Sequence, residues 1–124
     1  MAENEQSQCS GGEKLIFACS GAADVGDIAD RAARKMTKDG TGRMFCLAGV
    51  GGNIDAVIKA TKAASRILAI DGCELDCVKN CLQQADFVDF EHLRLTDLGL
   101  QKGASAASRE NIARVVDKAA EMLA

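Results

Sequence analysis

The chain has 124 residues, 48% of them hydrophobic and 27% charged, with a formal net charge of −3 at pH 7. This length and composition predict a single globular domain with its own apolar core. The negative charge, together with the absence of Trp and Tyr and only four Phe, offers neither a basic surface nor a stacking platform, so we expect no nucleic-acid binding. No apolar run approaches the roughly 20 residues of a membrane helix, so we expect no membrane association.

The first twelve residues are polar and carry Glu3 and Glu5. They lack the basic and apolar regions of a secretory signal peptide, so we expect residues 1–12 to be a disordered tail and residues 13–124 to form one domain. A protein without such a signal is expected to be cytoplasmic, where reducing systems keep cysteines as thiols. The six cysteines should therefore be ligands, nucleophiles or core residues rather than disulfides.

Four short runs are predicted to be β-strands, at residues 14–18, 43–48, 66–70 and 87–95. The first three are almost wholly apolar, as strands buried on both faces are. The fourth (FVDFEHLRL) is more mixed, which is typical of an edge strand with one wetter face.

Helical periodicity follows each predicted strand. The first helix should run from a capping Asp24 to the stop at Asp39 and Gly40, and the second should begin at a capping Asn53 after a glycine-rich loop at 49–52. The other two helices are predicted over residues 75–85, with Leu75, Val78 and Leu82 inward, and from about Ser108 onward.

This alternation predicts an α/β fold, namely a three-layer α/β/α sandwich around a four-stranded parallel sheet. Right-handed crossovers favour the flavodoxin-like or Rossmann-like strand order 2-1-3-4, with 3-2-1-4 as the alternative.

The cysteines provide the strongest functional signal. Cys19, Cys46 and Cys73 are spaced 27 residues apart, close to the length of one strand–helix–strand unit, and Cys77 follows one helical turn after Cys73. Equal spacing puts the thiols at the same end of neighbouring strands, where parallel sheets bind ligands. Neighbouring strands lie about 4.8 Å apart, so inward-curling loops could bring these sulfurs around one metal ion.

Two further cysteines are left out of this predicted site. Cys81 continues the helical series but lies roughly 12 Å along the axis from Cys73, too far to share an ion, so we interpret it as a residue packed on the sheet. Cys9 lies in the polar tail and is interpreted as an incidental thiol. A disulfide between Cys73 and Cys77 is an alternative, although helical geometry sets their Cβ vectors poorly for a bridge.

Other motifs support fewer conclusions. Residues 21–26 have glycines spaced as in a phosphate loop, but Asp27 replaces the required lysine. No basic residue before Arg31 could complete a cysteine phosphatase loop after Cys19. His92 is the only histidine, so we interpret it as surface or half-buried rather than a ligand. Asp71, beside Cys73, is expected to accept hydrogen bonds that shape the turn, with a supporting or acid–base role as the alternative.

Four motifs carry a family resemblance. They are Cys19-Ser20-Gly21 with Val25-Gly26, Phe45-Cys46-Leu47-Ala48-Gly49, Ile70-Asp71-Gly72-Cys73 with Cys77, and Leu95-Thr96-Asp97-Leu98-Gly99 before Lys102. Together they resemble the DGC domain family, zinc-binding proteins named for an Asp-Gly-Cys motif. The resemblance spans roughly residues 14–102. It implies that Cys19, Cys46, Cys73 and Cys77 are the family cysteines that bind zinc, and it implies no particular reaction.

We therefore expect a protein that holds one Zn²⁺ through the thiolates of Cys19, Cys46, Cys73 and Cys77, with a role in metal sensing, storage or transfer. The alternative is a thiol redox or sulfur-transfer protein that uses the same cysteines, one as nucleophile and a neighbour to resolve the intermediate. A four-cysteine iron–sulfur protein is a third interpretation.

Overall fold

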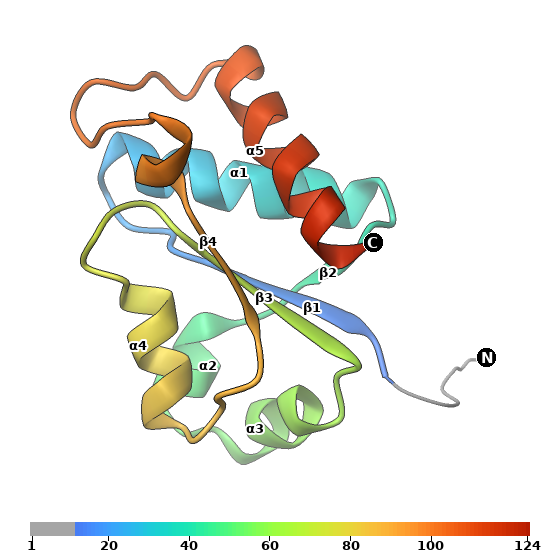
Figure 1. Cartoon of the computed structure of the whole chain (residues 1–124). Helices are drawn as coiled ribbons and strands as arrows, with labels where there is room; N and C mark the ends of the chain where they lie inside the picture. The colour runs from blue at the N-terminus through green and yellow to red at the C-terminus, as the bar shows by residue number, and fades with distance from the viewer. Residues whose placement is uncertain (1–11) are drawn as a thin grey trace.

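The computed structural model describes residues 12–124, and these residues contain a four-stranded sheet whose strands are all parallel (Figure 1). The strands are β1 (Lys14–Ala18), β2 (Arg43–Met44), β3 (Arg66–Asp71) and β4 (Glu91–Arg94). Their order is β2-β1-β3-β4, so the predicted order 2-1-3-4 is confirmed. Residues 1–11 of the predicted tail, including Cys9, lie outside the described residues.

Helices cover both faces of the sheet, so the predicted α/β/α sandwich is confirmed (Figure 1). One face carries α1 (Asp24–Lys38) and α5 (Arg109–Leu123). The other carries α2 (Leu47–Gly51), α3 (Asp55–Lys62) and α4 (Cys77–Gln84), and a short 3-10 helix, η1 (Leu95–Leu98), follows β4. None of these helices is both long and apolar enough to cross a membrane.

The sheet has two apolar cores because side chains alternate along each strand. Ile16 and Leu68 pack under α1 and α5, whereas Leu15 and Phe17 pack against α2 and α4. All four side chains are buried. The continuous apolar runs of β1 and β3 therefore reflect burial on both sides, and these two strands begin at the predicted residues.

The second predicted strand is wrong in extent. Strand β2 ends at Met44, and Cys46 occupies the N-cap position of α2. The predicted loop at 49–52 is mostly helix, because Gly49 allows α2 to pack closely on α3: a Cβ at Gly49 would lie 2.6 Å from Val57 Cγ2. Close packing therefore outweighs the low helix propensity of glycine here.

Two predicted helix caps are also wrong. Ala23 is the N-cap of α1, and the Asp24 carboxylate accepts hydrogen bonds from the N–H groups of Gly103 and Ser105, far along the chain. Ile54 is the N-cap of α3, while Asn53 adopts a left-handed conformation with φ of 55°. The Asp24 carboxylate thus joins α1 to a distant loop, in addition to a local hydrogen bond from the N–H of Val25 at 2.8 Å, and Asn53 lies in the turn before α3.

The remaining boundaries differ less. Helix α4 begins at Cys77, so Leu75 lies before it and is 66% exposed instead of inward, whereas Val78 and Leu82 are buried as predicted. The edge strand β4 is shorter than the predicted run at 87–95. Helix α5 begins where predicted, and Ser108 is its N-cap: the hydroxyl oxygen of Ser108 accepts a hydrogen bond from the N–H of Asn111.

Candidate metal centre

Four cysteines follow the carboxyl ends of three neighbouring strands. Cys19 comes directly after β1, and its N–H donates to the carbonyl of Ile70 on β3 at 2.9 Å. Cys46 comes two residues after β2, Cys73 two residues after β3, and Cys77 is the first residue of α4. All are free thiols; Cys46 and Cys77 are exposed, and Cys19 and Cys73 are partly buried.

The charges around Cys77 show that several of these groups lie close together. Partial burial raises the pKa of the Cys77 thiol, and the negative charges of Cys19, Asp71 and Cys73 raise that pKa further. Lys102 acts in the opposite direction, and its Nζ donates to Cys73 Sγ at 3.9 Å. Negative charge that accumulates among thiol groups suits a soft or borderline cation such as Zn²⁺.

The sulfur atoms are not arranged as a closed metal shell. Among residues 12–124, no three of the cysteine sulfurs lie within 4.8 Å of one another. Four sulfurs around one zinc lie about 3.8 Å apart, given a Zn–S distance of about 2.3 Å. Thiols are a donor type that zinc accepts, but the structure does not bring three of these sulfurs together, and the side chains would have to move closer in order to share an ion.

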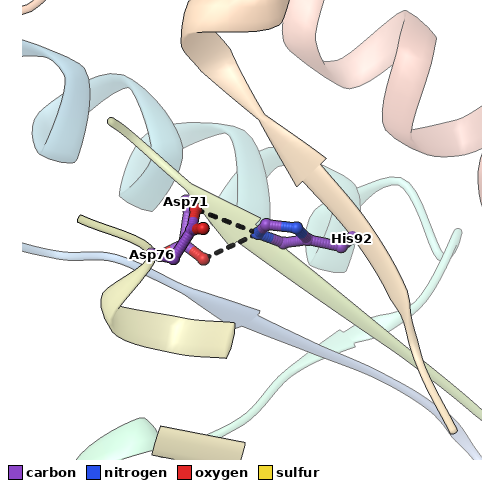
Figure 2. A group of neighbouring side chains, drawn as sticks. All are labelled: Asp71, Asp76 and His92. Atoms are coloured by element: carbon purple, nitrogen blue, oxygen red, sulfur yellow. Dashed lines mark hydrogen bonds and ion pairs between the residues drawn. The ribbon is translucent and has the colours of Figure 1, made fainter. Parts of the chain in front are cut away.

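Asp71, Asp76 and His92 form a second polar group, in which one possible ligand atom from each residue lies within 4.8 Å of the other two (Figure 2). His92 Nε2 lies 2.8 Å from Asp71 Oδ2 and 3.7 Å from Asp76 Oδ1. Asp71 is 1% exposed, and its carboxylate accepts hydrogen bonds from the N–H groups of Val78 at 2.7 Å and Lys79 at 3.1 Å.

Asp76 has a cationic partner already. Arg94 on β4 donates from Nε and Nη2 to the two carboxylate oxygens of Asp76 at 2.9 and 2.6 Å. These hydrogen bonds hold the pKa of Asp76 below its ordinary value and raise the pKa of Arg94. A metal ion bound to Asp76 would have to compete with this guanidinium. The donor types of the group therefore suit a cation, whereas the neighbouring positive charge of Arg94 disfavours one.

The family profile of the DGC domain matches residues 15–119 of the chain. The chain belongs to the DGC domain family. This DGC domain is also 39% identical over 88 residues to the anaerobic and virulence modulator AnvM of Pseudomonas aeruginosa, covering 71% of this chain and 67% of that protein. No solved structure matches the chain. Membership of the family supports a metal-binding role.

The fifth described cysteine of this DGC domain, Cys81, has a different environment. It is partly buried on α4, packs in the core beneath α2, and its Sγ lies 3.9 Å from the carbonyl oxygen of Leu47. Burial raises the pKa of its thiol. Cys81, Cys77 and Cys46 line one cavity of about 1760 Å³, which opens beside β2.

Sequence reasoning found some of the polar residues near the thiols and missed others. The expected turn-shaping hydrogen bonds of Asp71 are confirmed, and His92 is half-buried as expected. The ion pair between Asp76 and Arg94 was missed because the two residues are 18 positions apart and no local pattern links them. They meet because β3 and β4 pair with Asp71 opposite Arg94.

Proposed function

We propose that this DGC domain binds one Zn²⁺ through the thiolates of Cys19, Cys46, Cys73 and Cys77, and that it acts in metal sensing, storage or transfer. The main support for the proposal is the strand order, because the parallel neighbours β2, β1 and β3 are each followed by a cysteine at the same end of the sheet. A bound Zn²⁺ would hold these thiolates together and compensate their charge.

The fold supports an exchangeable rather than a purely structural metal. The domain already has two apolar cores, whereas structural zinc is typical of small domains that lack one. The exposure of Cys46 and Cys77 would leave a bound ion accessible to a chelator or a partner protein. Free thiols are also stable in a reducing compartment, so we propose a cytoplasmic location.

The similarity to AnvM favours sensing among the three roles. AnvM is named as an anaerobic and virulence modulator, and modulation is a regulatory role. A domain whose conformation depends on a bound metal could regulate in the same sense.

Metal analysis of anaerobically purified protein, made without chelator or affinity metal, tests the proposal. We expect about one zinc per chain, lost in Ser variants of Cys19, Cys46, Cys73 and Cys77. Cys9→Ser and Cys81→Ser are the matched controls and should keep the zinc. A folded wild-type protein that neither contains nor takes up zinc would contradict the proposal, and a coloured, iron-containing protein would replace zinc with an iron–sulfur cluster.

A thiol redox or sulfur-transfer function is the second candidate, and the contact between Lys102 and Cys73 favours it. Positive charge beside a thiol is typical of nucleophilic cysteines. Mild oxidation followed by peptide mapping tests this candidate: one disulfide that includes Cys73 would support it, whereas thiols protected equally by bound metal would contradict it.

A further inference from the structure

The segment between β3 and α4 carries Cys73 and leads directly to Cys77, and side chains from two strands hold it. Asp71, at the end of β3, contacts the start of α4. Arg94, at the end of β4, contacts Asp76 in the segment itself. The position of two predicted zinc ligands therefore depends on these contacts.

Asp71 performs the task of a helix cap from outside the helix. Its carboxylate accepts the N–H groups of Val78 and Lys79, the second and third residues of α4, which a capping side chain would ordinarily satisfy. The residue at the N-cap position, Asp76, makes no such hydrogen bond. The buried carboxylate of Asp71 thus fixes the first turn of α4 and with it the backbone of Cys77.

Asp76 has a left-handed backbone, with φ of 54° and ψ of 46°, which is unfavourable for a residue with a side chain. Its bidentate pair with Arg94 stabilises this conformation. Both side chains are largely shielded from solvent, with 14% of Asp76 and 27% of Arg94 exposed. A bidentate arginine–carboxylate pair restricts orientation as well as distance.

We infer that Asp71, Arg94 and His92 are positioning residues that form a clamp with Asp76 and hold the Cys73–Cys77 segment for metal binding, and that the Asp71–Asp76–His92 group is not a second cation site. His92 hydrogen bonds Asp71, and Arg94 supplies the positive charge that a cation would otherwise bring. The inference rests on the proposed zinc site. Residues that orient metal ligands typically change metal affinity 10–100-fold when replaced.

Zinc affinity measured by competition with a chromophoric chelator tests the clamp. Arg94→Gln should weaken zinc binding about 10-fold or more while one zinc per chain still binds at saturation. Arg94→Lys keeps the charge but lacks the two-pronged guanidinium, so its zinc affinity should lie between that of Arg94→Gln and that of wild type. Arg31→Gln is the matched control, because Arg31 forms an exposed pair with Asp27 at 2.8 Å on α1 and should leave the affinity unchanged.

Two results would overturn the inference. One is a zinc affinity of Arg94→Gln and Arg94→Lys within about twofold of wild type, since positioning residues change it more. The other is that wild type binds a second equivalent of zinc or manganese, that His92→Gln removes this equivalent, and that the thiolate-to-cobalt charge-transfer bands of cobalt-substituted protein stay unchanged. The Asp71–Asp76–His92 group would then be a cation site.

Hydrogen exchange separates failure of the clamp from failure of the zinc proposal. If wild type binds no zinc, the proposed function fails, and the clamp is then judged by exchange at the N–H groups of Val78 and Lys79 in metal-free protein. Faster exchange there in Arg94→Gln than in Arg31→Gln would support the clamp, and equal exchange would overturn it. Arg94→Lys provides the same comparison if Arg94→Gln does not fold.

Discussion

The two ends of the sheet differ in the contacts that their side chains make. Where β1 and β3 begin, Lys14 Nζ donates to the carbonyl of Leu123 at 2.7 Å and Arg66 Nη2 donates to that of Met122 at 2.6 Å. These cations satisfy the last carbonyls of α5, where the helix dipole favours positive charge. Where the strands end, free thiols and exposed side chains remain.

One end of the sheet therefore contributes to the stability of the fold, and the other end carries the groups proposed to bind metal. The contacts at the start of the strands use fixed charges and backbone carbonyls, and they join the sheet to α5. The contacts at the other end fix the backbone around Cys73 and Cys77 and leave the sulfur atoms without disulfide partners. Substitutions at the two ends should therefore affect different measurements.

The largest expected effect comes from the core beneath the thiols. Phe17 is fully buried, and its ring lies 6.0 Å from that of Phe45, which precedes Cys46, in an edge-to-face arrangement. Phe17→Ala should lower the free energy of unfolding by about 3–5 kcal/mol, since it leaves a cavity and loses this ring contact. Chemical denaturation of metal-free protein measures the loss; a decrease below about 1 kcal/mol would show that this core repacks.

A smaller effect is expected for Asp71→Ala. The change leaves the N–H groups of Val78 and Lys79 without their acceptor, which should cost about 2–3 kcal/mol. Unlike the changes at the opposite end, it should also weaken zinc binding. Denaturation and zinc competition on the same protein test both expectations, and a stable variant with full affinity would contradict them.

At the opposite end, Lys14→Met combined with Arg66→Met should lower the free energy of unfolding by about 1–2 kcal/mol, because the carbonyls of α5 lose charged donors. Zinc affinity should stay the same, since neither residue lies near the thiols. A combined variant that also loses zinc affinity would show that the two ends are coupled.

The last prediction concerns the loop that carries Lys102. The N–H groups of Gly103 and Ser105 hold the pKa of Asp24 below its ordinary value. The Asp24 carboxylate therefore contributes stability at neutral pH, and this contribution is lost as the pH falls below about 4 toward the lowered pKa. Melting temperatures between about pH 6 and pH 3 should fall more steeply for wild type than for Asp24→Asn; parallel curves would contradict this role.

The sequence by itself determined the layers of the fold and narrowed the strand order of the sheet to two arrangements. The apolar runs of β1 and β3 come from burial on both faces of the sheet, and the helical periodicity of α1 and α5 comes from burial of one face of each helix. Both are local patterns that can be read from the sequence. The crossover rule then restricted the strand order that the structure confirms. The DGC motif identified the family for the same reason, since it is read directly from neighbouring residues.

Only the tertiary structure decided where the polar side chains find their partners. The ion pair of Asp76 with Arg94 depends on the pairing of β3 with β4, and the partners of Asp24 lie about 80 residues along the chain. The helix at Leu47–Gly51 depends on how closely Gly49 can approach Val57. Such contacts are set by the distance between elements after packing, and no local periodicity encodes that distance.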